Sequence, residues 1–461
     1  MKALRALGMD GAVVFTFLAK AVNIAGSVGT VLLIVHFLTP VEQGYYYTLL
    51  SLVSLQIVFE LGFSVVVLQL AAHEAVHLTM TSQGEVGGDA AAHARLASAL
   101  QLSVRWYSVA AVAMAVLLAP LGIFFFSRHA GGQNQIAWQG PWLAAVIASS
   151  ISLWCIPLYA FLEGCGQVRA VAAMRLRQAA ASALLGWAAL IVHHGLYSPG
   201  LVILGQIAVG LIFVARHKRL LAGLMRHHSP GVTIEWQREV WPFQWRIAVS
   251  SMCSYFTVQV FIPILFALRG PVEAGQLGMS LSITGYMTTL ALAWTSTKSA
   301  PFGNMIARRA FGELDLLFRR TWSQSLAVFT ALAVAACIGS ALLPWIAPRL
   351  AARLVSPAIF AVLAAAAGAN CAIQGLGTFL RSFKSEPFLA QSLGAAAASL
   401  LLIALTAPEW GNAGAALSYT AATAGLALPW SLSVFVRARR GYLSAHVPVC
   451  PNLAREGALR S

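Results

Sequence analysis

The chain has 461 residues, of which 59% are hydrophobic and only 10% are charged, and its mean hydropathy is +0.76. A water-soluble domain needs a charged exterior, so this composition excludes one and indicates a protein surrounded by lipid. The formal net charge of +15 would by itself fit a nucleic-acid-binding protein. No soluble domain is left to present a basic face, however, so we expect no nucleic-acid partner.

Twelve apolar stretches follow one another along the chain, and most are near the ~20 residues that span a bilayer as a helix. In hydrocarbon the backbone must satisfy its own hydrogen bonds, which leaves helices or closed barrels. Barrel strands alternate in polarity and these stretches do not, so we predict an all-α polytopic membrane protein. We expect the spans at residues 12–37, 45–72, 101–126, 142–165, 179–196, 200–215, 247–268, 276–297, 322–347, 354–380, 388–407 and 412–436.

Lys and Arg residues fall mainly on one side of these spans. If the N-terminus is cytoplasmic, 25 of the 30 basic residues lie on the cytoplasmic side, and Arg128, Arg269, Arg349 and Arg353 lie on the other. Basic loops are retained in the cytoplasm, so we predict cytoplasmic N- and C-termini and contact with membrane lipid. Apolar residues at helical spacing in the inner loop 298–321 also predict an interfacial amphipathic helix. The tyrosines at positions 45–47, near a span end, are predicted to be interfacial anchors.

The chain contains a weak internal repeat. A shift of 231 positions aligns Pro40–Ser51 with Pro271–Ser282, and six of the twelve positions are identical. Both windows form the outer turn between the first two helices of a half, so we predict two six-helix lobes related by a pseudo-two-fold axis along the membrane normal. The expected domains are an N-terminal lobe (1–220), a cytoplasmic linker with an interfacial helix (221–246), a C-terminal lobe (247–436) and a basic cytoplasmic tail (437–461).

Polar residues inside the spans are the candidates for a path through the bundle. Lys20 and Glu60 matter most, because a charge at mid-bilayer normally faces an interior cavity. Helical spacing puts Asn23 and Ser27 on the stripe of Lys20, and Gln56 on that of Glu60. At 1.5 Å per residue, Lys20 and Glu60 lie roughly 12 and 18 Å from the cytoplasmic ends of their helices, so the two are able to meet.

Two interpretations of Lys20 and Glu60 stay open. The first is structural: an ion pair, or a lysine that snorkels to the membrane surface. The second is a water-filled path in which Lys20 binds an anionic group and Glu60 tunes it or carries a proton. Under the repeat, Ser251 and Ser254 are the equivalents of Lys20 and Asn23, so the second half keeps polar residues at these positions but no charge. Gln259 joins the candidate path, although such residues more often form interhelical hydrogen bonds.

One motif indicates different chemistry. His73–His77 matches HExxH, in which two His on one helical face bind zinc and Glu74 activates water. A third ligand would have to come from Glu85, Asp89, His93 or a distant span. A membrane zinc protease is therefore one alternative. We favour a polar cluster that closes a helix end, and expect no enzyme activity, no metal and no cofactor.

Leu38–Tyr47 resembles the turn between the first two helices of the polysaccharide-flippase branch of the multidrug/oligosaccharidyl-lipid/polysaccharide exporter superfamily. Gln56–Glu74 and Glu239–Arg246 are similar to bacterial lipopolysaccharide-biosynthesis membrane proteins of this kind. The resemblance in topology covers nearly the whole chain. It implies an inner-membrane flippase that moves undecaprenyl-diphosphate-linked oligosaccharide, a precursor of O-antigen or other polysaccharide, to the periplasmic leaflet by alternating access. The cationic cavity of such proteins would correspond to Lys20.

The same superfamily contains drug and organic-cation antiporters, which are the main alternative. An antiporter needs carboxylates in its cavity for cations or protons, and Glu60 is the only carboxylate deep in a predicted span. The sequence does not choose between H⁺ and Na⁺ as a coupling ion.

Overall fold

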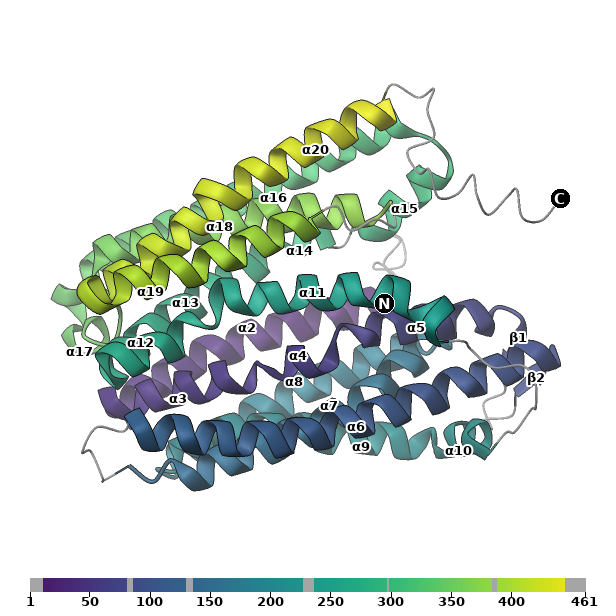
Figure 1. Ribbon diagram of the computed structural model, residues 1–461, viewed down its shortest axis with the longest axis horizontal. Helices are drawn as coiled ribbons and strands as arrows, with labels where there is room; N and C mark the ends of the chain where they lie inside the picture. The colour runs from purple at the N-terminus through teal and green to yellow at the C-terminus, as the bar shows by residue number, and fades with distance from the viewer. Residues whose placement is uncertain are drawn as a thin grey trace. The chain divides into compact units, whose positions relative to one another are not determined.

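The computed structural model describes residues 11–80, 86–129, 136–226, 236–296, 298–383 and 388–443, and nearly all of them are helical (Figure 1). By compactness the chain divides into two units. Unit 1 comprises Met1–Tyr255 and Ile262–Gly278, and unit 2 comprises Phe256–Phe261 and Met279–Ser461.

The first part of unit 1 consists of α2 (Gly11–Phe37), α3 (Pro40–Val53), α4 (Gln56–Glu60), α5 (Phe63–Ala75) and the antiparallel hairpin of β1 (Leu78–Met80) and β2 (Val86–Gly88). There follow α6 (Ala90–His129), α7 (Gln139–Gly164), α8 (Val168–Ile191), η1 (Gly195–Tyr197), α9 (Ser198–Arg216), α10 (Lys218–Arg226), η2 (Trp236–Val240), α11 (Trp241–Val258), most of α12 (Phe261–Arg269) and the start of α13 (Pro271–Ala291).

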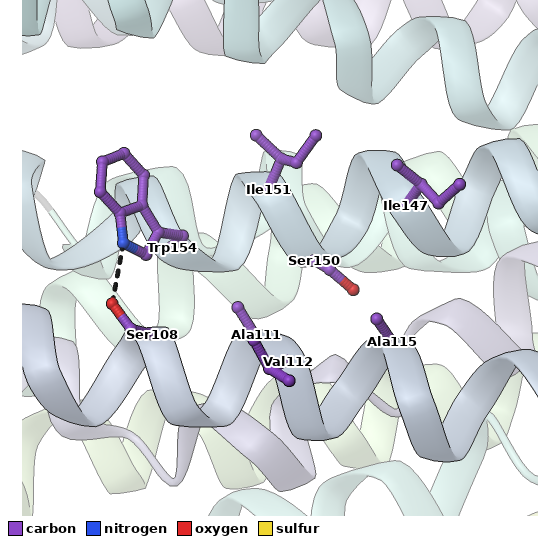
Figure 2. Close-up of a pocket in the computed structure, with 8 residues that line it drawn as sticks. All are labelled: Ser108, Ala111, Val112, Ala115, Ile147, Ser150, Ile151 and Trp154. Atoms are coloured by element: carbon purple, nitrogen blue, oxygen red, sulfur yellow. Dashed lines mark hydrogen bonds between the residues drawn. The ribbon is translucent and has the colours of Figure 1, made fainter.

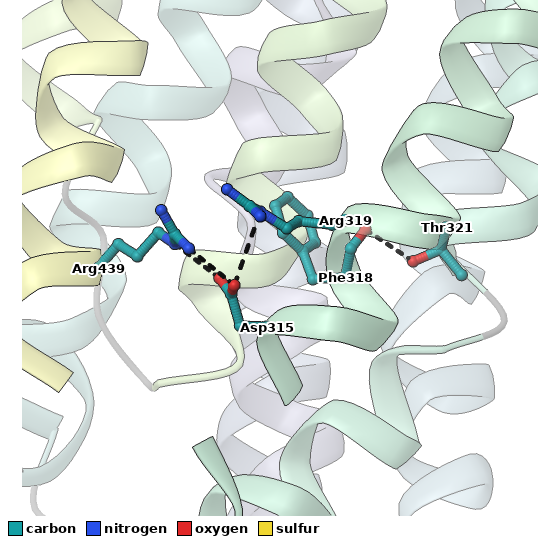
Figure 3. A network of polar contacts seen from close by, with 5 residues as sticks. All are labelled: Asp315, Phe318, Arg319, Thr321 and Arg439. Carbon is teal, nitrogen blue, oxygen red and sulfur yellow. Dashed lines mark hydrogen bonds and ion pairs between the residues drawn. The ribbon is translucent and has the colours of Figure 1, made fainter. Parts of the chain in front are cut away.

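Unit 2 contains the remainder of α13 and then α14 (Ala293–Ser296), α15 (Ser299–Ala307), α16 (Phe311–Ile346), α17 (Pro348–Ala351), α18 (Pro357–Arg381), α19 (Leu389–Thr420), η3 (Ala421–Ala427) and α20 (Leu428–Leu443). An ion pair joins two of these helices: the Arg439 guanidinium on α20 donates to both carboxylate oxygens of Asp315 on α16, at 2.7 and 2.8 Å (Figure 3). Arg319 approaches the same carboxylate at 3.6 Å.

Eight helical runs in the described chain are long and apolar enough to cross a membrane, and the pair Pro40–Glu60 and Phe63–Ala75, bent by 44°, gives a ninth. The run Leu389–Gly441 makes two crossings. Gly411 has φ 50° and ψ −127°, and Thr406 Oγ1 lies 2.8 Å from Ser418 Oγ. Twelve residues of straight helix would separate these groups by about 18 Å, so the chain reverses at Gly411.

The helix α8 is also a span, although its three arginines lower its hydropathy. Its side chains and those of α9 form an antiparallel ladder: Gln178 donates to the Gln206 carbonyl, Ser182 to Val202, and Ser198 back to Gly186. With α13, which is 21 residues long, the described residues provide twelve helical segments long enough to cross a bilayer. The predicted all-α polytopic fold is therefore confirmed, whereas the predicted domain boundaries stay a prediction.

The start of α3 shows why the Leu38–Tyr47 turn has its sequence. Thr39 Oγ1 accepts a hydrogen bond from the Glu42 amide at 3.2 Å, and the Glu42 carboxylate accepts one from the Thr39 amide at 2.8 Å. This reciprocal capping box, with Pro40 at the first helical position, starts the helix sharply. Tyr45 is not the interfacial anchor that its residue type predicts: it is 1% exposed and packs on Phe126 and Phe266.

The predicted interfacial helix at 298–321 is wrong for its second half. Residues from Phe311 onward belong to the 36-residue helix α16, and Leu314 and Phe318 are fully buried in unit 2. The Phe318 ring lies 4.2 Å from that of Phe379 on α18. The apolar face therefore covers a neighbouring helix and not the membrane surface. Within the predicted linker and tail, residues 227–235 and 444–461 lie outside the described residues.

Candidate translocation path

The second span of unit 1 is broken between α4 and α5. Leu61 and Gly62 both adopt left-handed backbone conformations, with φ of 52° and 63°. A Cβ at Gly62 would lie 2.3 Å from the Ile247 methyl group and 3.7 Å from Ser251 Oγ, so α11 packs closely over the break. Any other residue at position 62 would be strained by both its backbone and its neighbours. The break interrupts the helical hydrogen bonds inside an apolar span, which is tolerated where protein or a cavity surrounds it.

Glu60 is the last residue of α4 and stands directly at this break. Its carboxylate is half-buried and accepts a hydrogen bond of 2.6 Å from Ser64 Oγ, on the first turn of α5. The buried side chain of Tyr107 on α6 lies near this carboxylate. The site therefore combines a carboxylate with two hydroxyls, contributed by three different helices.

Aromatic rings surround the start of α5. Phe63 stacks on Tyr107 at 5.9 Å and meets Trp236 edge-on at 5.1 Å, while Trp106 stacks on Trp236 at 4.9 Å. Phe63 and Tyr107 are fully buried, so their faces pack against protein. The cluster holds the broken helix against α6 and η2.

One side chain of the polar stripe predicted on α2 forms its hydrogen bond within the same helix. Lys20 is half-buried and Asn23 is exposed, whereas Ser27 donates its hydroxyl hydrogen to the Asn23 carbonyl at 2.7 Å. The opposite face packs on α8, where a Cβ at Gly29 would lie 2.5 Å from Trp187. Nine residues make about two and a half helical turns, so Gly29 lies directly opposite Lys20. Lys20 is consequently turned away from the α8 contact.

The structure brings some predicted path residues together and separates others. Glu60, with Gln56 one turn earlier on α4, lies at the break that Ser251 also faces. Ser254 is exposed, and its hydroxyl donates to the Ser251 carbonyl at 2.7 Å. The Glu60 carboxylate accepts a hydrogen bond from Ser64 on α5. Gln259 is exposed in the turn between α11 and α12 and belongs to unit 2.

The carboxylate of the HExxH motif, on Glu74, has a structural role. Glu74 is 5% exposed and accepts a 2.8 Å hydrogen bond from the Arg95 guanidinium of α6, beside the β1–β2 hairpin. The Asp89 carboxylate accepts the Ala92 amide and so starts α6. No group of three metal-ligating side chains occurs in the described part of the chain, and Glu85 lies outside it. A carboxylate held by arginine is not available to activate water.

Sequence reasoning missed the break itself and the side chains that support it. Tyr107 gave no signal, since it is one aromatic residue within a long apolar span. The adjacent Leu61 and Gly62 gave a weak one, because glycine inside a helix often marks an irregular backbone. Trp236 lies in the predicted linker, and only the fold places it against Phe63.

Two apolar recesses on unit 1 contain none of the predicted path residues. The first, of about 450 Å³, lies between α6 and α7, and Trp154 Nε1 donates to Ser108 Oγ across it at 3.0 Å (Figure 2). The second, of about 510 Å³, shares Ile147 and Ile151 with the first. Ile147 is 56% exposed, so these recesses open to the lipid side of the helices.

Comparison with known proteins identifies the fold. No protein-family model matches the chain, and no curated protein sequence matches it. Solved structures do. The MATE multidrug transporter DinF-BH, solved with a bound ligand, aligns with a TM-score of 0.62 and 14% identity, over 94% of this chain and 96% of that one. The lipid II flippase MurJ, in an inward closed conformation, aligns with a TM-score of 0.57 and 13% identity, over 94% and 90%.

A MOP superfamily transporter from Pyrococcus furiosus is a third similar structure, with a TM-score of 0.53 and 12% identity over 95% of this chain and 99% of that one; its binding pocket is described as having reverse polarity. The chain therefore has the twelve-helix fold of the multidrug/oligosaccharidyl-lipid/polysaccharide exporters. At these identities the likeness shows the fold, which both drug transporters and a lipid flippase share.

Proposed function

We propose that this protein is a bacterial inner-membrane transporter that flips undecaprenyl-diphosphate-linked oligosaccharide from the cytoplasmic to the periplasmic leaflet by alternating access. In this proposal both termini are cytoplasmic, as the distribution of basic residues favours. Residues 1–220 and 247–436 act as the two lobes, and 221–246 link them.

The observation that carries the proposal is the position of Lys20. Its ammonium group belongs to a side chain that is half-buried, on the face of α2 opposite the α8 contact, about 13 Å from the start of the helix. A cation at this depth is stabilised by anionic or hydrated groups, and a diphosphate provides strong charge-assisted hydrogen bonds. The MurJ likeness supports a lipid-linked substrate.

The proposal is tested in a strain that lacks the protein. We expect undecaprenyl-linked repeat units to accumulate on the cytoplasmic leaflet and surface polysaccharide to fall. When the deletion strain expresses the Lys20→Arg variant, we expect part of the surface polysaccharide to return. When it expresses Lys20→Ala, we expect none to return, although this variant is inserted into the membrane at normal levels. Val28→Ala is the matched control on the same helix: its side chain is 56% exposed and is not among the predicted path residues, so this variant restores polysaccharide fully.

Export of an organic cation is the second candidate function. Glu60 favours it, because a half-buried carboxylate next to Tyr107 is suited to a cation or a proton. The DinF-BH likeness also supports it. Against it, Phe63 and Tyr107 are fully buried, so the faces of these two rings are not available to a cation. Unchanged glycan with raised sensitivity to cationic dyes in the deletion strain would favour this function over flipping.

A further inference from the structure

The short helix α10 is strongly amphipathic. Leu220, Leu221 and Leu224 are buried against the rest of unit 1, whereas Lys218, Arg219 and Arg226 are exposed. The helix is nine residues long and thus presents positive charge outward at both of its ends.

Helix α10 is fixed to α6 at its C-terminal end. Gln101 Nε2 on α6 donates to the carbonyls of Leu224 and Met225, at 3.4 and 3.2 Å. Carbonyls of a last helical turn lack partners within their own helix, so the glutamine serves as their cap. The attachment holds the basic face of α10 beside α6.

A recess of about 570 Å³ lies at this junction. Its wall on α6 consists of residues on one helical face, at spacings of three and four. Helix α10 adds one further residue to the wall. The lining residues are Ser98, Gln101, Leu102, Val104, Arg105 and Met225. Arg105 is exposed, and the recess combines a cation, two polar groups and apolar side chains, without a carboxylate among its lining residues in the described chain.

The depth of the recess can be read from exposed side chains. Helix α6 has 40 residues and is about 60 Å long, twice the thickness of a bilayer core. Val109 and Val112 are 67% and 64% exposed and so mark the part that faces lipid tails. Arg105 lies one turn before Val109. On α9, exposed Ile212 likewise precedes the basic residues of α10 by about two turns. The recess therefore lies where hydrocarbon meets lipid headgroups.

We propose that this recess binds the headgroup of an anionic phospholipid. Arg105 and the basic face of α10 attract its phosphate and net negative charge, Ser98 offers a hydroxyl group, and Leu102 and Met225 cover the start of the acyl chains. A zwitterionic lipid lacks the net charge to match this surface. The proposal is independent of the transported substrate.

The test measures lipid retention by the purified full-length protein. In native mass spectrometry, we expect phosphatidylglycerol to be retained in preference to phosphatidylcholine. Arg105→Gln weakens this preference about fivefold, and the added changes Lys218→Gln, Arg219→Gln and Arg226→Gln weaken it further. Arg105→Lys keeps most of it. Glycerol phosphate, which lacks acyl chains, does not displace the lipid at equal concentration.

Arg128→Gln is the matched control, since Arg128 is exposed near the other end of the same helix. This variant keeps the wild-type lipid preference. An unchanged preference in Arg105→Gln, or an equal loss in Arg128→Gln, would overturn the proposed site. Displacement by glycerol phosphate alone would show a simple phosphate site and would also overturn the lipid assignment.

Discussion

The contact between α3 and the start of α13 gives the sharpest structural prediction. A Cβ at Gly44 would lie 1.9 Å from the Pro271 carbonyl oxygen, and one at Gly275 would lie 2.8 Å from the Gly44 nitrogen. Gln43 Nε2 donates to the Gly275 carbonyl at 2.9 Å. The two copies of the Pro-Val-Glu-x-Gly repeat thus meet backbone to backbone within unit 1.

Gly44→Ala must push the two backbones apart by about 1 Å, since real Cβ contacts below 3.0 Å do not occur. Overpacking of this kind destabilises by about 1–3 kcal/mol. We expect a lower midpoint of thermal unfolding in detergent, measured by the loss of monodisperse protein on size exclusion. The matched control is Gly285→Ala on α13, where nothing lies within 4 Å of the added carbon. This control keeps or gains stability, because alanine favours helix by about 0.5–1 kcal/mol.

The reasoning is refuted if Gly44→Ala unfolds at the wild-type temperature, or if Gly285→Ala loses as much stability. Equal losses would mean that any glycine in this bundle is sensitive, whatever its neighbours.

Three further changes test separate parts of the structure. Asp315→Asn removes the charge that binds Arg439 and should destabilise by about 1–3 kcal/mol in thermal unfolding; a smaller loss in Asp315→Asn than in a surface control would contradict the ion pair's role. Gly411→Ala places a side chain at φ 50° and ψ −127° and should cost about 1–3 kcal/mol in the same assay, whereas full stability would exclude the strained turn. Glu74→Gln should weaken the hold on Arg95 without altering the glycan phenotype, and chelation of zinc should change neither stability nor phenotype; bound zinc would revive the protease alternative.

The fold was predictable because the hydropathy and length of each membrane span depend only on the residues of that span. The predicted span at 179–196 covers the apolar second half of α8 and begins after its three arginines. The last two predicted spans are separated near Gly411, where a short polar stretch interrupts the apolar run. In each case the cost of exposing backbone to lipid leaves few options.

Contacts between helices were less predictable. Tyr45 fits an interfacial anchor by residue type, but burial against Phe126 depends on which helix arrives beside it. Leu314 and Phe318 have the spacing of a membrane-surface helix, and a helix that covers α18 has the same spacing. Glu74 completes a zinc-binding sequence motif with its near neighbours. In the fold, however, Arg95, 21 residues later, binds its carboxylate and gives it a structural role.

The candidate path was predictable in part. Charge inside an apolar span pointed to Glu60, which the structure places at the helix break with Ser251 nearby. The break required a left-handed conformation at Leu61, which no composition rule predicts. A pairing of Lys20 with Glu60 stays one of the open interpretations, because one hydroxyl hydrogen bond does not saturate a carboxylate.

Flipping in proteoliposomes is the most direct measurement of the central claim. Purified protein is reconstituted with undecaprenyl-diphosphate oligosaccharide in the inner leaflet, and the appearance of glycan outside is followed by its accessibility to an added glycosidase. The account predicts flipping by the wild-type protein and by Val28→Ala, and none by Lys20→Ala. No flipping by any of the three, combined with export of an organic cation that requires Glu60, would contradict it.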